Sequence, residues 1–182
     1  MSEDFIVLNC APTLSGVKVG NLVSQFYTDA DEVRSFISGK DRLLKPKGVR
    51  VVLLKLSSKT ALIYVYRQKQ LARLLSRTGI QKFLGKYGYK EFSVDACLSL
   101  LRCRLQLNDF PHEIGVFLGY PLSDIQAFID NKGANCPCTG YWKAYTNIDR
   151  AKLIFRLYRR CTDRCCRKYE NGTDILRLTT AG

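Results

Sequence analysis

The residue types best suited to chemistry lie in one segment of the sequence, from Pro111 to Tyr145. This segment holds the only histidine of the chain, His112, followed directly by the carboxylate of Glu113. A histidine can serve as a general base or as a metal ligand near neutral pH. Because no serine, cysteine or carboxylate can be paired with His112 from its spacing, we favour a capping or hydrogen-bonding role for both residues over catalysis.

Cysteines near the end of this segment could bind a metal. Cys136 and Cys138 offer two thiolates, and Cys161, Cys165 and Cys166 could add ligands for zinc or an iron–sulfur cluster if the C-terminal helix lies beside them. However, Cys-x-Cys is not the usual Cys-x-x-Cys metal knuckle, and Cys161 and Cys165 fall on an apolar stripe. We therefore expect no bound metal, and a redox pair or a reactive thiol at Cys136 and Cys138 stays open.

An aromatic pair beside a cation follows these cysteines. Tyr141, Trp142 and Lys143 could stack on a flat ligand such as a nucleobase, a flavin or haem. Burial as an anchor of the core is the commoner fate of a tryptophan. The three residues are therefore candidate site residues, and they do not identify a cofactor.

Positive charge is in excess and is unevenly distributed. The chain has 29 Lys and Arg against 16 Asp and Glu, a formal net charge of +13, and residues 110–148 are close to neutral. Helical spacing gathers basic side chains into two rows. The rows are Lys69, Arg73 and Arg77 in one helix, and Lys152, Arg156, Arg160, Arg164 and Arg167 in another. Solvated surface is the alternative interpretation, but the total charge favours an acidic partner, either a protein or a nucleic acid.

Length and composition predict a single globular domain over residues 1–182. The 46% hydrophobic residues are enough to bury a core. The N-terminal residues are acidic where a signal peptide is basic, and no apolar stretch reaches the roughly 18 residues of a membrane span. We expect a cytoplasmic protein without a membrane association, whose eight cysteines are reduced thiols.

The elements that must position these residues follow an α+β pattern. Val49–Leu56 and Ala61–Arg67 are rich in β-branched and aromatic residues and predict a hairpin, with 17–27 as a candidate third strand. Helices are predicted over 31–44, 68–76, 80–87, 93–107, 111–118, 123–133 and 149–169, with a capping box of Ser123 and Gln126. The expected fold is a small antiparallel sheet of about three strands in the N-terminal half, packed with a mostly helical C-terminal half.

Residues 114–129 have the spacing of a helix-turn-helix unit, with the turn at Leu118 and Gly119. The second helix would expose Asp124 and Asp130, and carboxylates are unfavourable beside phosphates. We therefore favour an αα-hairpin that serves packing.

Three motifs together resemble an uncharacterised bacterial family, the domain of unknown function 3793. They are Cys10-Ala11-Pro12-Thr13-Leu14 with Gly16, the run from His112 to Leu122, and Gly140-Tyr141-Trp142-Lys143 with Tyr145. The resemblance places Cys10 among the candidate site residues and implies no reaction. Its members are similar in coming mostly from anaerobic bacteria, and their genes often lie near flavodoxin or ferrous-iron uptake genes, which implies a role in iron or redox metabolism.

These observations support three hypotheses. The first is an accessory protein in iron or redox metabolism that docks an acidic protein, such as a flavodoxin, through its basic helical faces. The second is a nucleic-acid-binding protein that uses the same faces and the helix-turn-helix-like segment. The third is an enzyme with its site around Cys10, His112 and Trp142.

Overall fold

A three-stranded antiparallel sheet lies at the centre of the molecule in the computed structural model, which describes residues 3–107 and 109–181. Its strands are β1 (Gly20–Phe26), β2 (Val49–Leu56) and β3 (Thr60–Arg67), in the order β1-β3-β2. The predicted hairpin and the predicted third strand are both confirmed, and β3 is the central strand. The α+β class is confirmed as well.

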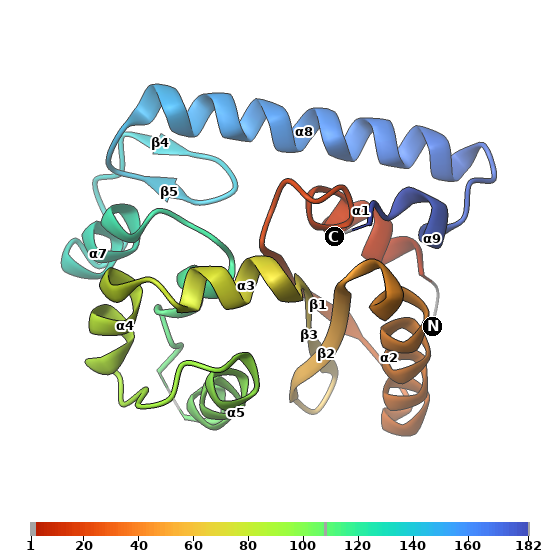
Figure 1. The fold of residues 1–182 in the computed structure, drawn as a ribbon, viewed down its shortest axis with the longest axis horizontal. Helices are drawn as coiled ribbons and strands as arrows, with labels where there is room; N and C mark the ends of the chain where they lie inside the picture. The colour runs from red at the N-terminus through yellow and green to blue at the C-terminus, as the bar shows by residue number, and fades with distance from the viewer. Residues whose placement is uncertain (1–2, 108, 182) are drawn as a thin grey trace.

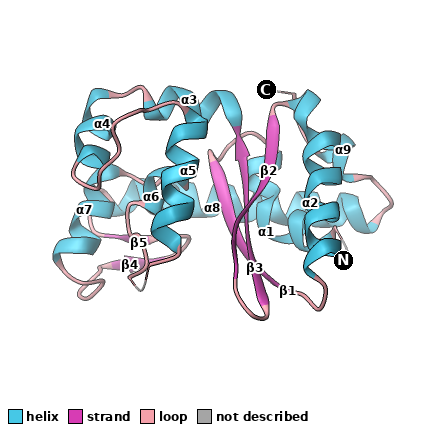
Figure 2. Ribbon diagram, turned by 90° about the horizontal axis from the view of Figure 1, so that it is seen from below, coloured by secondary structure: helices cyan, strands magenta, loops and turns pink. Residues whose placement is uncertain are grey.

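Helices cover both faces of this sheet (Figures 1 and 2). In chain order they are α1 (Asp4–Leu14), α2 (Ala30–Leu44), the 3-10 helix η1 (Lys45–Lys47), α3 (Gln68–Leu75), α4 (Thr78–Gly85), α5 (Val94–Leu105), α6 (Ile114–Phe117), α7 (Leu122–Asp130), α8 (Ile148–Glu170) and α9 (Ile175–Leu178). A small hairpin of β4 (Cys138–Thr139) and β5 (Lys143–Ala144) lies between α7 and α8. None of the helices in the described part of the chain is long and apolar enough to cross a membrane.

Alternating side chains of β3 pack on opposite faces of the sheet, as expected for a strand covered on both sides. Ala61, Ile63 and Val65 point to one face, and Tyr64 and Tyr66 point to the other. The first face packs on α1, α2 and α9, forming what we call the N-terminal cluster, which includes Ile6, Cys10, Val33 and Ile175. Apolar residues on both faces of the hairpin are thus explained by two separate cores.

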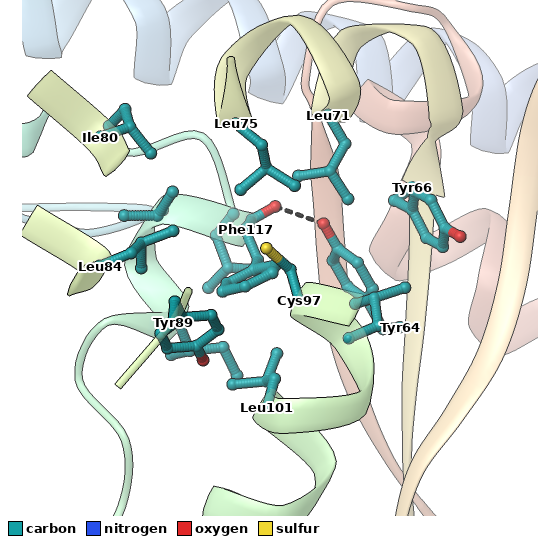
Figure 3. Packing of buried hydrophobic residues seen from close by; sticks show 14 of the residues in the cluster. Tyr64, Tyr66, Leu71, Leu75, Ile80, Leu84, Tyr89, Cys97, Leu101 and Phe117 are labelled. Carbon is teal, nitrogen blue, oxygen red and sulfur yellow. Dashed lines mark hydrogen bonds between the residues drawn. The ribbon is translucent and has the colours of Figure 1, made fainter. Parts of the chain in front are cut away.

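The second face packs on α3, α4, α5 and α6 and forms the large cluster, whose centre is drawn in Figure 3. The rings of Tyr64 and Tyr66 stack with centroids 4.9 Å apart, and the Tyr64 hydroxyl donates a hydrogen bond of 2.5 Å to the carbonyl of Phe117. This bond lets a buried phenol sit in an apolar core without an unpaired polar atom. It also ties α6, and with it the segment after His112, to the sheet.

Capping residues explain where three of the longer helices, α2, α5 and α8, begin. Asp29 caps α2 by accepting from the amide of Asp31, Ser93 caps α5 by accepting from Ala96, and Asn147 caps α8 by accepting from Arg150. The capping box predicted for Ser123 is wrong, because α7 begins at Leu122 after Pro121 and has no side-chain cap. The Ser123 hydroxyl instead lies 2.9 Å from that of Thr146.

The long helix α8 connects two parts of the core. Its N-terminal half packs through Ala151, Phe155 and Tyr158 on Trp142 and Ala144 of the small hairpin, and we call these five residues the tryptophan cluster. Its C-terminal half packs on α1, where Cys165 joins the N-terminal cluster. Figure 1 shows α8 running along one side of the molecule from the β4-β5 hairpin to α9.

Candidate functional site

Three of the residues singled out in the sequence line one apolar cavity. His112, Trp142 and Lys143 contribute to a cavity of about 240 Å³ between β1, α6, α7 and the β4-β5 hairpin. Its other walls are formed mainly by apolar and aromatic side chains, among them Tyr120 and Phe128. Tyr141, the neighbour of Trp142, does not line it and packs against Tyr158 of α8 instead.

Trp142 is held in place by packing and by one buried carboxylate. The indole is 8% exposed, stacks on Tyr120 with centroids 5.2 Å apart and meets Phe155 edge-on at 4.5 Å. Gly140 leaves room for this packing, since a Cβ there would overlap the ring of Phe155. The indole N–H donates to Asp124 at 2.7 Å. Trp142 is thus a core anchor that also presents one surface to the cavity.

Asp124 was expected to be exposed on the second helix of a helix-turn-helix unit, and this is wrong. It is 2% exposed, and besides Trp142 it accepts from the amides of Tyr145 and Thr146 and from the Thr146 hydroxyl. Four donors satisfy the carboxylate, which offsets the cost of its burial. Asp124 therefore holds the chain in place after β5. The first helix of the expected helix-turn-helix unit, α6, is a single turn whose residues are all buried, so it serves packing.

Two basic side chains of the cavity, His112 and Lys143, lie beside aromatic rings. His112 is exposed and meets Phe128 edge-on, with centroids 5.1 Å apart. The ammonium of Lys143 lies 5.8 Å from the centroid of Phe128 and donates to the carbonyl of Gly133 at 2.7 Å. This arrangement can hold an apolar group with negative charge beside Lys143.

Glu113 lies next to His112 in sequence but does not share its environment. Its side chain is fully buried, forms a salt bridge with Arg104 of α5 and accepts a hydrogen bond of 3.4 Å from Tyr89. Burial is the main cause of the raised pKa of the Tyr89 hydroxyl, which stays a neutral donor. Glu113 therefore connects α5 to α6 and is absent from the cavity.

Cys10 lies in the N-terminal cluster, separate from His112 and Trp142. It has no exposed surface, and burial raises the pKa of its thiol to about 12. A thiol that is neutral and covered is a poor nucleophile. The site that combined Cys10, His112 and Trp142 is not assembled by this fold.

Lys18 is a buried cation that the sequence analysis did not identify. It is 3% exposed, its ammonium donates to the carbonyl of Gly20 and lies 5.4 Å from the centroid of Tyr120. Burial lowers its pKa to about 7. Lys18 stands between Val17 and Val19 in the predicted strand 17–27, where this alternation is the pattern of a solvent-facing residue, so no sequence signal marks its burial.

The remaining cysteines do not gather into one site. Cys136 and Cys138 are half-buried, and the Cys136 sulfur lies 3.2 Å from the Thr139 hydroxyl. Cys165 faces α1, with its sulfur 3.4 Å from the Ser15 hydroxyl. Within residues 3–107 and 109–181, no three His, Cys, Asp or Glu side chains lie close enough together to hold a metal ion.

A second, more polar cleft of about 600 Å³ shares Tyr120 and Trp142 with the apolar cavity as lining residues. It is lined by Arg77 after α3 and Arg150 of α8, together with residues at the start of α7. One member of the shorter basic row therefore faces the same cleft as the N-terminal turn of α8. Lys69, Arg73 and Arg77 are all exposed, as predicted.

The longer basic row forms the outer surface of α8. Lys152, Arg156, Arg160, Arg164 and Arg167 are all exposed, and we call these five residues the basic face of α8. Two leucines, Leu153 and Leu157, are 58% and 46% exposed on the same side of the helix. The basic residues were predicted from the sequence, whereas the two leucines were not.

Comparisons with known proteins agree with the resemblance noted in the sequence. No curated protein and no solved structure matches this chain. One family model does, over residues 6–179, which include the buried Cys10 as well as the cavity of His112, Trp142 and Lys143. The chain therefore belongs to the family described as Protein of unknown function (DUF3793).

Proposed function

We propose that this protein docks an acidic protein partner through the basic face of α8. The observation that carries the proposal is the arrangement of this face: five exposed cations beside two exposed leucines on a helix anchored at both ends. The partner that the family resemblance implies is a flavodoxin, whose acidic surface has the opposite charge.

The cations of this face form no salt bridge within the described part of the chain, although Arg167 donates to the carbonyl of Asp163 at 3.2 Å. No acidic side chain there forms a salt bridge with Lys152, Arg156, Arg160, Arg164 or Arg167. Like charges four residues apart on a helix cost about 0.2–0.5 kcal/mol per pair. The series Lys152, Arg156, Arg160 and Arg164 contains three such pairs in succession. Acidic groups of a partner would turn this repulsion into attraction.

The two leucines favour a protein over a nucleic acid. Leu153 and Leu157 precede Arg156 and Arg160 by three residues each, so the apolar and basic side chains share one face of the helix. Protein interfaces combine apolar anchors with a charged rim. The backbone of a nucleic acid offers phosphates along the whole contact and little that would cover two leucines. Nucleic-acid binding is therefore the alternative that the experiment must separate.

The experiment measures association with a flavodoxin and with mixed-sequence DNA and RNA at two salt concentrations. Reversing Arg156 and Arg160 to glutamate is expected to slow association with the flavodoxin at least about tenfold at low salt, because steering depends on charge at the rim. Truncating Leu153 and Leu157 to alanine is expected to speed dissociation instead.

The matched control reverses Lys82 and Lys86, an exposed pair with the same spacing at α4. It changes the net charge by the same amount and is expected to have a much smaller effect. Equal effects of the two double variants would mean that only total charge matters. Tight nucleic-acid binding with a slope of log K against log salt near −0.9 per phosphate contacted, and no binding of flavodoxin, would favour the alternative instead.

A further inference from the structure

The apolar cavity at Trp142 is separate from the basic face of α8 and needs its own explanation. It lies between α7 and the β4-β5 hairpin, whereas the basic face points away from the tryptophan cluster. It is open to solvent at exposed residues such as His112 and Lys143, and ligand sites are typically concave and mostly apolar with a few polar groups. An opening of about 240 Å³ bounded by Leu22, Ile125, Phe128 and Trp142 is therefore a candidate binding site.

The polar groups around the cavity define the charge of its ligand. Asp124 lines the cavity, but its carboxylate already accepts from Trp142, Tyr145 and Thr146. These residues supply four donors, three to Oδ1 and one to Oδ2, so the protein itself largely offsets the charge of Asp124. Lys143 uses one of its three donors on the carbonyl of Gly133 and keeps two for a ligand. An anionic group at Lys143 is the arrangement that these partners favour.

The volume and the walls define the rest of the ligand. An apolar cavity of roughly 150 Å³ takes one benzene ring. A cavity of about 240 Å³ has room for one ring with a short chain, or for two fused rings. The rings of Phe128, Tyr120 and Trp142 give it flat walls suited to a planar guest.

We propose that this cavity binds a small aromatic carboxylate of one or two rings, with the ring between Phe128 and Trp142 and the carboxylate on the ammonium of Lys143. His112, which is exposed at the cavity and contacts Phe128, lies where it can donate a second hydrogen bond to the carboxylate. The cavity recognises the ligand by its shape and by one charge. It is therefore proposed as a binding site, without a reaction.

The test titrates the protein with 3-phenylpropanoate and with indole-3-acetate, and uses 3-phenylpropanol as the uncharged comparison. Trp142 is the only tryptophan, so its fluorescence reports directly on the cavity in the titrations with the two phenyl compounds. Calorimetry measures the affinity of all three compounds, because indole-3-acetate is itself fluorescent. For a ligand of this size we expect a Kd of about 0.1 mM. The alcohol is expected to bind about tenfold more weakly.

Two variants test the charge of the cavity and its walls separately. Lys143→Met is expected to weaken the carboxylates about tenfold and to leave the alcohol unchanged, whereas Lys132→Met, which removes a nearby charge outside the cavity, is the matched control. Leu22→Phe, a substitution that a strand tolerates, is expected to fill part of the cavity and to weaken all three compounds. Circular dichroism checks the fold of each variant.

Several outcomes would overturn the proposal. If neither carboxylate binds at millimolar concentration, the site is excluded. Equal affinity for the alcohol, or equal effects of Lys143→Met and Lys132→Met, would exclude the anionic recognition. Binding that is unchanged in Leu22→Phe would place the ligand elsewhere on the protein. None of these outcomes bears on the docking of an acidic protein at α8.

Discussion

Replacing Lys18 by methionine tests how a buried cation affects the stability of this fold. Within the described residues no carboxylate pairs with Lys18, and its ammonium meets the carbonyl of Gly20, the ring of Tyr120 and the thiol of Cys10. The thiol of Cys10 stays protonated because burial raises its pKa to about 12, so it does not provide a counter-ion. Methionine keeps the length of the side chain and removes the charge.

The expected dependence on pH follows from the two pKa values of Lys18. Burial lowers the pKa from 10.5 to about 7 in the folded protein, whereas the unfolded chain keeps the ordinary value. Between about pH 7 and pH 9 the unfolded chain holds a proton that the folded protein has lost, so the free energy of unfolding rises with pH. A slope approaching about 1.4 kcal/mol per pH unit gives a gain of about 2 kcal/mol over this range.

The variant is therefore expected to be more stable than the parent at neutral pH, and its advantage to shrink by about 2 kcal/mol towards about pH 9. Urea unfolding of both proteins at several pH values measures the difference. Buried thiols and phenols have raised pKa values, so they lower the free energy of unfolding as pH rises, opposite to the effect of Lys18. These groups are present in both proteins, so their effect cancels when the two are compared. Lys152→Met, at an exposed position, is expected to show no pH-dependent difference. An advantage of Lys18→Met that stays constant with pH would refute the reasoning, because Lys18 would then be charged in the folded protein.

Two further predictions concern the clamp that Arg67 forms at the C-terminal end of α1 and the half-buried cysteines Cys136 and Cys138. Arg67, which is 2% exposed, donates to the carbonyls of Thr13, Leu14, Lys47 and Thr180. Arg67→Met is expected to lower the free energy of unfolding by about 3 kcal/mol or more, because it removes several hydrogen bonds from a buried position. The exposed Arg73→Met is expected to change it by less than about 0.5 kcal/mol, and similar losses in both variants would contradict the clamp. Replacing Cys136 and Cys138 by serine is expected to change neither the metal content of protein purified without oxygen nor its stability by more than about 1 kcal/mol, and stoichiometric zinc or iron lost in that variant would show a metal site.

Long elements with a strong local pattern were predictable from the sequence. The hairpin β2-β3 is marked by β-branched residues, and α2, α5 and α8 combine a helical period with a capping residue. The apolar stripe of α8 is similarly local. These features depend on residues within a few positions of one another, so a single sequence contains them.

Elements without a strong local pattern were not predicted, because tertiary contacts stabilise them. The helix α1 is covered by α8 and β1, and its nearly continuous apolar residues with Pro12 show no helical period. The strands β4 and β5 have two residues each and depend on the bonds that Asp124 makes after β5. The predicted helix at 111–118 is reduced to α6 for the same reason.

The site was predictable in its residue types but not in its grouping. The segment after Pro111 does supply His112, Trp142 and Lys143 to one cavity, as its composition indicated. Glu113 leaves this group because a helical step turns it towards Arg104, and Cys10 leaves it because the sheet separates the two cores. Neither fact could be derived from spacing along the chain.

The position of α8 has a consequence for how the molecule comes apart. One end of this helix completes the tryptophan cluster, and the other end completes the N-terminal cluster. If either cluster opens, the apolar side chains on half of α8 lose their packing partners. A helix without such packing is only marginally stable in water. The helix thus acts as a mechanical strut that makes local openings at its two ends interdependent. Cooperative units in hydrogen exchange should accordingly follow α8 across the molecule and not stop at the edge of the sheet.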